Sequence, residues 1–444
     1  MAPLPTPRLL VLAMGAVVPL ILATVFAEAL YLGVAYVVMV AAIVALDLRR
    51  TPSAKAFRVG RRHEERLSLG AANPVDVQVE WFGQRVMESK RSIRLWIRDE
   101  TPPGIPVDKL VLDGAILPGA EWTGRYHLIP RRRGDYAFGS ITIRVETPFR
   151  LLVLQYSYLA AGPVRVYPNL LAVRRYELLA RHGRLNEIGL RQTRLIGRGT
   201  EYERLRDYVT DDDYRRIAWK ATARRHQPVT VEFETERSQN LILLLDTGRL
   251  MGTPVGDMEK LDHAVNAVLM LSYVALQRDD RVGLIAFADR VDVYVPPSRG
   301  RRQFHLLLES LYKIRAQPIE SNPGRALSFA AARQAKRSLM VLLTDFAEAA
   351  DAEDLVAHLG YLARRHLPLC VTLSDPDILD LSTRRTTDSR RAYERVVAQR
   401  LLDERRSILD TLEQQGAYVL DVSAEQLTAE VINRYLEIKA KTLL

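Results

Sequence analysis

The chain has 444 residues, of which 48% are hydrophobic and 26% are charged. This length excludes a single ordinary core and favours two or three folded domains, while the composition excludes a largely disordered chain. The net charge of +10 raises the question of nucleic acid, but the arginines alternate with acids along the whole chain, which fits a basic protein beside an anionic membrane surface better. The single cysteine, Cys370, excludes an intramolecular disulfide.

Two apolar segments come first in the chain. Residues 9–26 contain no charged side chain, and residues 30–46 contain none either, so each is about long enough to cross the hydrocarbon core as a helix. We expect a transmembrane helical hairpin over residues 1–50. Arg8 precedes the hairpin and Arg49 and Arg50 follow it, which predicts that both ends are cytoplasmic. The alternative is a signal peptide cleaved near the Ala-Glu-Ala sequence at residues 27–29.

Residues 51–170 consist of short runs in which apolar and polar residues alternate. SIRLWIRDE at residues 92–100 and SITIRVETP at residues 140–148 are examples. Alternation with a period of two, broken by proline and glycine turns, predicts a half-buried antiparallel β-sandwich. The segment has no His, Asp or Glu cluster with the spacing of metal ligands. We therefore expect a spacer or a protein-binding module here, not an enzyme core.

In residues 240–444, apolar runs alternate with segments of helical period. This pattern predicts a doubly wound α/β domain, whose mostly parallel sheet is covered by helices on both faces. Asp246 ends the run LILLLD, and Asp345 ends the run SLMVLLTD with Thr344 beside it. Ligands bind outside the carboxyl ends of such strands, so the two carboxylates are the start of an oxygen-ligand site for a hard divalent cation. The alternative is that each acid only caps the following helix.

The catalytic motifs that can be recognised from sequence are absent. The chain contains no GxxxxGK[ST] loop, no GxSxG motif and no HExxH motif, and its eight histidines are dispersed singly. Nothing supplies a nucleophile together with its base. We therefore expect no enzymatic activity.

Residues 171–239 link the two domains and contain the stretch GTEYERLRDYVTDDDYRRIAWKATAR at residues 199–224. One interpretation is a catalytic or metal site at residues 211–213. Three consecutive acids cannot share one helical face, however, so we favour a turn and N-cap before a helix over residues 214–224, which packs as a collar between the domains. The residues expected to form this collar or to contact a partner are Arg204, Arg206, Tyr208, Asp212, Asp213, Arg216, Trp219, Arg224 and Arg249.

Three stretches carry a family resemblance: RRRGDYAFGSITIRVETPFRLL at residues 131–152, GRGTEYERLRDYVTDDDYRRIAWKATAR at residues 197–224 and LLLDTGRLM at residues 243–251. Their order after two apolar segments resembles the bacterial domain of unknown function 58 (DUF58) family. The resemblance implies a C-terminal unit similar to a von Willebrand factor A domain. It also implies adaptor or assembly work beside MoxR-type AAA+ ATPases and other von Willebrand factor A proteins.

The resemblance supplies a template for a metal site, in which the first strand ends Asp-x-Ser-x-Ser and later loops give Thr and Asp. Asp246 and Asp345 match the two aspartates, but Gly248 and Leu250 replace both serines. The loop expected to give the threonine, at residues 320–324, offers only Ser321 and Asn322 as oxygen donors. Because cation affinity follows the number of oxygen ligands, we expect a degenerate, metal-free surface, with Mg²⁺ as the one cofactor to test.

Together these features predict a scaffold or adaptor in the bacterial inner membrane, with two membrane helices and cytoplasmic domains. Its expected partners are proteins, a MoxR-type ATPase and other von Willebrand factor A proteins among them, and membrane lipid. Two alternatives stay open: a metal-dependent hydrolase that uses Asp246 and Asp345, and a basic nucleic-acid-binding protein. The second lacks a recognition helix, a zinc site and a stacking sheet, so we expect no nucleic acid.

Overall fold

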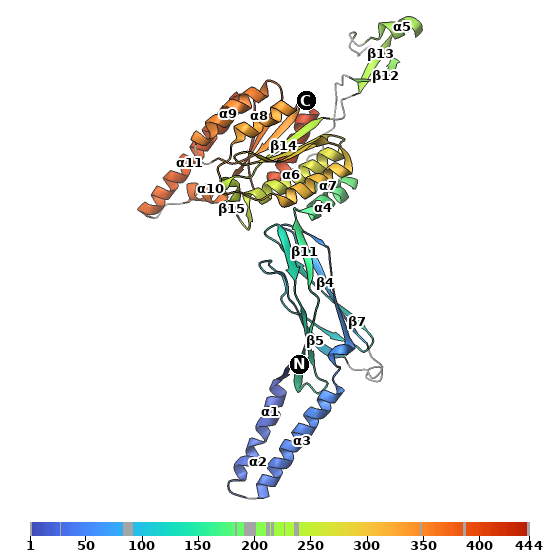
Figure 1. The fold of residues 1–444 in the computed structure, drawn as a ribbon, viewed down its shortest axis with the longest axis vertical. Coiled ribbons are helices and arrows are strands. Elements are labelled where there is room, and N and C mark those ends of the chain that lie inside the picture. Colours follow the sequence, from blue (N-terminus) through green and yellow to red (C-terminus); the bar gives the residue numbers. More distant parts are fainter. Residues whose placement is uncertain are drawn as a thin grey trace. The chain divides into compact units, whose positions relative to one another are not determined.

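The computed structural model describes residues 2–26, 28–82, 92–182, 184–190, 201–209, 214, 217–225, 227–234, 239–346, 349–384 and 388–441. The chain divides into two compact units, Met1–Tyr167 and Pro168–Leu444. In Figure 1 the first unit is coloured from blue to green-blue and the second from green to red. The first unit combines the two domains expected over residues 1–50 and 51–170, and the second contains the segment expected as a separate linker over residues 171–239.

Three apolar helices come first: α1 (Pro7–Gly15), α2 (Val17–Leu22) and α3 (Glu28–Arg50). One helical segment, residues 28–56, is long and apolar enough to span a membrane, with a mean hydropathy of 2.5 and 11% of its apolar window buried. The other predicted membrane helix is divided between α1 and α2. Pro19 has no N–H to donate to the carbonyl of Gly15, the residue at which α1 ends. The hydroxyl of Tyr36 in α3 donates to the carbonyl of Leu12 at 2.9 Å, so the two apolar segments touch.

The rest of the first unit is built from antiparallel sheets of alternating residues, as the sequence predicts. A five-stranded sheet has the order β1-β10-β9-β5-β6, and two three-stranded sheets have the orders β2-β4-β7 and β3-β11-β8. In β4, for example, Val75, Val77 and Val79 are fully buried while the residues between them are not. The strands are β1 (Ala2–Pro5), β2 (Phe57–His63), β3 (Arg66–Ser68), β4 (Asn73–Trp81), β5 (Ile93–Asp99), β6 (Leu112–Ile116), β7 (Glu121–Leu128), β8 (Gly134–Phe138), β9 (Ile141–Glu146), β10 (Leu152–Tyr158) and β11 (Gly162–Tyr167).

Both ends of the apolar helical segment are tied to the strand domain. Strand β1, which the sequence did not predict, pairs with β10 immediately before α1. Near the end of α3, the buried Oδ1 of Asp47 accepts a hydrogen bond from the backbone N of Phe149 at 2.8 Å. A hydrogen bond to a charged carboxylate is stronger than a neutral one. The entry and the exit of the helical segment are therefore fixed to the same sheet and its neighbouring turn.

The second unit contains the predicted α/β sheet, with the order β18-β17-β14-β19-β20-β21. Numbered along the chain, this is the order 3-2-1-4-5-6 of a doubly wound fold. All neighbouring strands are parallel except β17 and β18, and every residue of β14 after the first is buried. The strands are β14 (Asn240–Asp246), β17 (Arg281–Phe287), β18 (Val291–Ser298), β19 (Leu339–Leu343), β20 (Leu367–Ser374) and β21 (Tyr418–Ser423).

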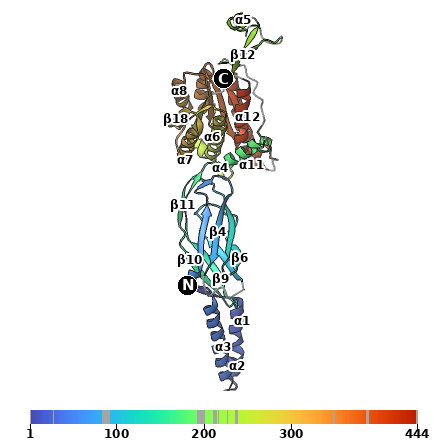
Figure 2. The same ribbon diagram turned by 90° about the vertical axis from the view of Figure 1, so that its right-hand side faces the viewer.

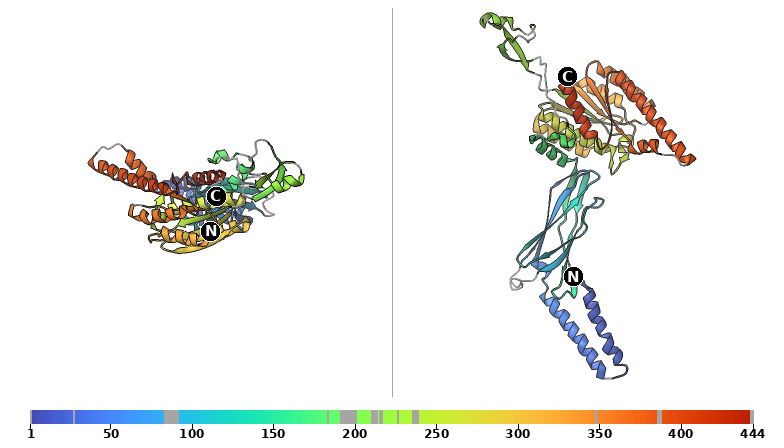
Figure 3. Two further views of the ribbon diagram at one scale, coloured as in Figure 1. Left: turned by 90° about the horizontal axis from the view of Figure 1, so that it is seen from above. Right: turned by 180° about the vertical axis from the view of Figure 1, so that it is seen from behind.

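Helices cover both faces of this sheet (Figure 2). On one face, α8 (Pro323–Arg333), α9 (Ala349–Ala363) and α11 (Ser389–Gln414) pack on an apolar cluster that includes Ile242, Phe287 and Met340. On the other, α12 (Leu427–Ala440) packs against α6 (Lys260–Gln277), which also contacts α7 (Gly300–Lys313); Figure 3 shows α12 across the sheet from α11. The sequence predicted these helices, but not α4 (Leu170–Arg181) or α10 (Pro376–Thr383).

Cys370 lies in the centre of β20 and is fully buried. Burial raises the pKa of its thiol to about 12, because the thiolate would lose its hydration. A thiol that stays protonated at physiological pH is a poor nucleophile. Cys370 is therefore part of the hydrophobic core, as the apolar run around it predicts.

Candidate functional site

Two acidic residues lie at the carboxyl edge of the six-stranded sheet, where the strand order reverses. Asp246 is the last residue of β14, and Asp345 follows β19, which pairs with β14. Neighbouring parallel strands end at the same edge, so side chains that follow them meet there. The structure thus brings together the two acids that the sequence singled out.

The carboxylate of Asp246 is buried, with 1% of the residue exposed. Its Oδ1 accepts a hydrogen bond from the backbone N of Gly248 at 2.7 Å, and its Oδ2 accepts from Ser321 Oγ at 2.8 Å and Thr344 Oγ1 at 2.5 Å. Burial raises the pKa of Asp246, and these three hydrogen bonds oppose that rise because they favour the charged form. Both oxygens of Asp246 are therefore occupied by donors from within the chain.

The carboxylate of Asp345 is held by two cations. Its Oδ2 accepts from Lys260 Nζ at 2.7 Å, and its Oδ1 accepts from Arg405 Nη1 at 2.8 Å and from the backbone N of Phe346 at 3.0 Å. The side chains of Lys260 and Asp345 are only 9% and 5% exposed. Lys260 is the first residue of α6, and Arg405 projects from α11. One aspartate thus links the two helical layers across the edge of the sheet.

Arg405 extends the network to the next strands. Its Nη2 donates to Asp421 Oδ1 in β21 at 3.0 Å and to the carbonyl of Leu373 in β20 at 2.9 Å. Its guanidinium carbon lies 5.1 Å from the ring centroid of Phe346. The guanidinium group therefore bridges three consecutive strand ends, a geometry that suits its fixed fork of donors.

The residues at this edge do not fit the metal-site template as they stand. The hydroxyls of Ser321 and Thr344 donate to Asp246, and both oxygens of Asp345 already accept from cations. Gly248, which replaces the first template serine, has no room for a side chain, since a Cβ there would lie 2.9 Å from the Cβ of Ser321. A divalent cation would need oxygens that are free to coordinate it.

A small cavity of about 50 Å³ lies in front of this network. It has room for a few water molecules and is well below the several hundred Å³ typical of ligand pockets. Its rim includes the exposed Arg249 and Glu320, together with the half-buried Leu250 of the template position. The full lining is Arg249, Leu250, Glu320, Ser321, Pro323, Thr344, Asp345, Phe346 and Leu355.

The segment before the sheet differs from the predicted collar helix. Strands β12 (Glu201–Asp207) and β13 (Val229–Glu234) form an antiparallel pair, and the helix α5 between them is only Trp219–Arg225. Tyr214 is 65% exposed and Trp219 is 69% exposed. The expectation that these aromatic side chains pack in a collar is therefore wrong for this structure. Aromatic residues at helical spacing were misleading because the strand pairing is non-local.

The other residues predicted for the collar or for partner contact do not gather into one site. Arg204 and Arg206 lie in β12, opposite Glu232 and Thr230, and Tyr208 follows that strand. Arg224 is exposed in α5, whereas Arg249 lies at the edge of the main sheet. Asp212, Asp213 and Arg216 are outside the described residues, as is Asp211.

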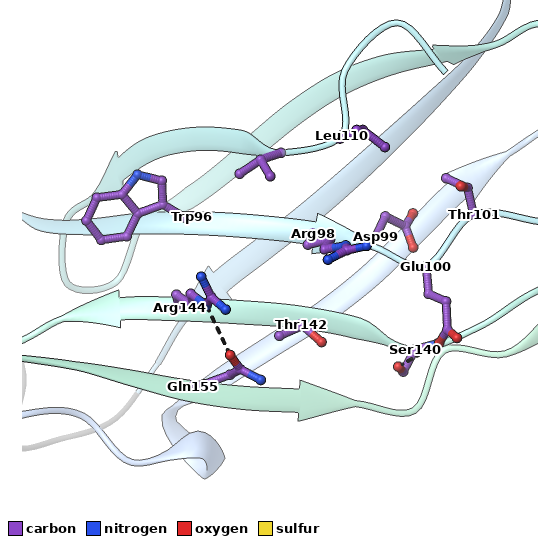
Figure 4. A pocket seen from close by; sticks show the side chains of 11 residues that line it. Trp96, Arg98, Asp99, Glu100, Thr101, Leu110, Ser140, Thr142, Arg144 and Gln155 are labelled. Carbon is purple, nitrogen blue, oxygen red and sulfur yellow. Dashed lines mark hydrogen bonds between the residues drawn. The ribbon is translucent and has the colours of Figure 1, made fainter. Parts of the chain in front are cut away.

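A second and larger cavity, of about 430 Å³, lies on the outer face of the five-stranded sheet of the first unit (Figure 4). The strand register sets Arg144 between Trp96 and Gln155, and sets Arg98 opposite Thr142. We name it the sandwich cavity. Its lining residues are Trp96, Arg98, Asp99, Glu100, Thr101, Leu110, Val111, Ser140, Thr142, Arg144 and Gln155.

Three sets of site residues were not predicted from the sequence, and two of them had a signal in it. Lys260 stands in the first turn of a mostly apolar helix, where the helix dipole disfavours a cation, so its position called for a nearby acid. Trp96 and Arg98 alternate with buried residues in β5 and therefore mark an outward face that is unusually rich in recognition groups. Arg405 had no such signal, because it lies among several arginines and acids in α11.

Comparison with known proteins supports the family resemblance for part of the chain. Residues 204–405 match the family described as "Protein of unknown function DUF58", which confirms the resemblance over this segment. The chain is 25% identical over 187 residues to the uncharacterized protein Rv1480 of Mycobacterium tuberculosis, covering 42% of this chain and 58% of that protein. It is 26% identical over 251 residues to the uncharacterized protein YeaD of Bacillus subtilis, covering 54% of this chain and 59% of that protein. The match thus spans less than two thirds of each relative's length.

Solved structures similar to this chain include von Willebrand factor A (VWA) domains. BatB from Bacteroides thetaiotaomicron is 14% identical, with 46% of this chain and 99% of that chain covered and a TM-score of 0.32. The VWA domain of SpRpn10 is 11% identical, with 44% and 94% covered and a TM-score of 0.29.

Restoring the template serine at position 248 tests the packing of this site. We expect Gly248→Ser to lower the free energy of unfolding by about 1–3 kcal/mol, because the new Cβ overlaps the Cβ of Ser321. The double variant Gly248→Ser/Ser321→Gly should recover part of the loss, since it removes the overlapping carbon. Thermal unfolding of the three proteins measures both effects. A Gly248→Ser variant as stable as the parent would contradict the close approach of the two loops.

Proposed function

We propose that this chain is a membrane-anchored scaffold that binds protein partners through its α/β domain, and that it catalyses no reaction. The proposal rests on one observation: the carboxylate oxygens of Asp246 and Asp345 all accept hydrogen bonds or form ion pairs within the domain. A catalytic acid or base needs access to substrate and a pKa suited to proton transfer. Neither carboxylate has a free oxygen facing a substrate-sized cavity, which supports a binding surface in preference to a hydrolase.

Membrane anchorage is supported by the N-terminal helices. In α3, Tyr31 and Leu32 are 79% and 69% exposed, and in α1 Val11 is 69% exposed, so apolar side chains of these helices face outward. Large apolar surface of this kind is unfavourable in water and favourable in lipid. Arg8, Arg49 and Arg50 flank the apolar helices on the side of the strand domain, which by the positive-inside rule supports a cytoplasmic location for that side.

A pair of reporter fusions tests this topology. Green fluorescent protein fused after residue 444 should fluoresce, and alkaline phosphatase at the same site should be inactive, because we expect the C-terminus to be cytoplasmic. The full-length chain should also stay in the membrane fraction after a high-salt wash. Active alkaline phosphatase at this position would overturn the proposed orientation, and release by salt would overturn the anchorage.

The carboxyl edge of the α/β sheet is the face we assign to partner binding. There Arg249 and Glu320 are exposed around the small cavity, while the acids behind them are neutralised within the domain. Exposed charges of this kind set the specificity and rate of association more than its affinity. Because of the DUF58 resemblance, we propose a MoxR-type AAA+ ATPase as the first partner to test. We further propose that the two proteins together assemble or activate a client complex.

Direct binding to a MoxR-type ATPase from the same bacterium tests this assignment. We expect Arg249→Glu to weaken binding at least about fivefold, since the exposed guanidinium is replaced by the opposite charge. Arg302→Glu is the matched control. Arg302 is exposed near the start of α7, which follows β18, and β18 ends beside the start of β17, away from the carboxyl edge. Surface-plasmon resonance on the detergent-solubilised full chain measures both. Equal effects of the two variants would contradict a partner site at the carboxyl edge.

A second candidate function, binding of an anionic ligand, is favoured by the charges of the sandwich cavity. Among the described residues, Arg98 has no hydrogen bond or ion pair, and Arg144 donates only to the neutral Gln155, at 3.0 Å. Glu100, whose pKa is lowered mainly by hydrogen bonds from Ser140 and less by the charge of Arg98, already accepts two hydrogen bonds from Ser140.

The apolar parts of the sandwich cavity complete this candidate site. Leu110 is 68% exposed, Val111 is 51% exposed and Trp96 is half-buried, and all three line the cavity. We therefore propose a ligand in which a carboxylate or phosphate adjoins a flat apolar group, since guanidinium groups bind such oxyanions and the indole ring stacks on flat groups.

Two small probes distinguish the sources of this chemistry: N-acetylphenylalanine carries a carboxylate, and phenyl phosphate carries a phosphate. We expect at least one to bind the full chain, and Arg98→Gln and Arg144→Gln each to weaken that binding about tenfold, as for loss of a charged hydrogen bond. Arg58→Gln, at an exposed position of β2, is the control. Ligand-observed nuclear magnetic resonance measures the affinities. No binding of either probe, or equal binding by the variants, would remove this candidate.

A further inference from the structure

We infer that the ammonium group of Lys260 is a built-in cation that takes the place of a divalent metal between the first and fourth strands of the α/β sheet. It lies 2.7 Å from Asp345 Oδ2, the residue that matches the last aspartate of the metal-site template. The inference goes beyond the proposed function, because it concerns how the partner-binding edge is held together.

The position of Lys260 makes an accidental surface ion pair a poor explanation. Its side chain is 9% exposed, and an unpaired ammonium group at that depth would be strongly unfavourable. It also stands at the N-terminal end of α6, where the helix dipole repels positive charge. The cost of burying the ammonium group and the unfavourable helix dipole are therefore both offset by the ion pair with Asp345, 85 positions away in the chain.

The charge at the site matches what a divalent cation would bring. Lys260 and Arg405 each carry one positive charge, and both contact Asp345, on different carboxylate oxygens. The remaining carboxylate, Asp246, is stabilised by hydroxyl and backbone donors from Ser321, Thr344 and Gly248. A metal bound to Asp345 Oδ2 would have to displace the ammonium group, since both require the same oxygen at short distance.

Removing the amine should therefore uncover a cation site. Lys260→Met keeps the volume of the aliphatic stem and frees Asp345 Oδ2 beside Asp246. We expect this variant to bind Mn²⁺ at least about tenfold more tightly than the parent chain, and its melting temperature to rise with added Mn²⁺. The parent should show neither effect and should be insensitive to EDTA.

A second buried lysine of the chain provides a matched control. Lys439 Nζ lies 2.6 Å from Asp280 Oδ1, with side chains 7% and 1% exposed, at the opposite edge of the sheet where β17 begins. Lys439→Met removes a comparable ion pair but leaves one buried carboxylate, Asp280, instead of two, so it should lose stability without gaining Mn²⁺ affinity. Lys260→Met/Asp246→Asn should likewise lose the gained affinity.

Electron paramagnetic resonance of Mn²⁺ with the full chain in detergent separates the outcomes. Gain of binding in Lys260→Met alone supports the inference. Binding of Mn²⁺ by the parent chain overturns it, and so does a folded Lys260→Met variant without affinity for Mn²⁺. If Lys260→Met does not fold, the parent's own response to Mn²⁺ and EDTA still decides. None of these readouts involves a partner, so failure here leaves the scaffold proposal open to its own test.

Discussion

The α/β domain depends on how it neutralises two carboxylates at the point where its strand order reverses. A doubly wound sheet brings the ends of β14 and β19 together, so Asp246 and Asp345 meet at one edge. Neighbouring buried carboxylates repel each other and lose hydration, and the charge of Asp345 adds to the raised pKa of Asp246. Hydroxyl and backbone groups donate hydrogen bonds to Asp246, and Lys260 and Arg405 form ion pairs with Asp345. Those two cations come from helices on opposite faces of the sheet, so the same contacts also join the layers.

The polar groups at this edge stabilise the domain and leave few free to bind a metal or a substrate. The template implied by the family resemblance uses serine oxygens and a metal, whereas here Gly248 makes room for the loop that carries Ser321. The serine hydroxyl then reaches Asp246 from the other side, at 2.8 Å. A site whose donors and acceptors are all paired internally has little left with which to activate a substrate. Its contacts hold the surrounding loops, and with them Arg249 and Glu320, in one conformation, as the proposed binding of a partner requires.

The sequence was sufficient to predict the layers of the fold and the acids of the site, and insufficient for the contacts that connect them. Apolar runs such as LILLLD predict buried strands because about six residues suit a strand and are too few for a typical helix, and Asp246 follows from where that run ends. The partners of Asp345 lie 85 and 60 positions away, and spacing along the chain gives no indication of them. The pairing of β12 with β13 was missed for a similar reason, because its hydrogen bonds join two strands separated by more than twenty residues of chain.

In the proposed arrangement, the ammonium group of Lys260 takes the place of a metal at Asp345, beside Asp246. The most direct measurement is a crystal structure of the chain grown in millimolar Mn²⁺, with anomalous diffraction recorded to locate manganese. We expect Lys260 Nζ against Asp345 Oδ2 and no anomalous peak at the carboxyl edge of the sheet. An anomalous peak between the two aspartates, with Lys260 turned away, would contradict it.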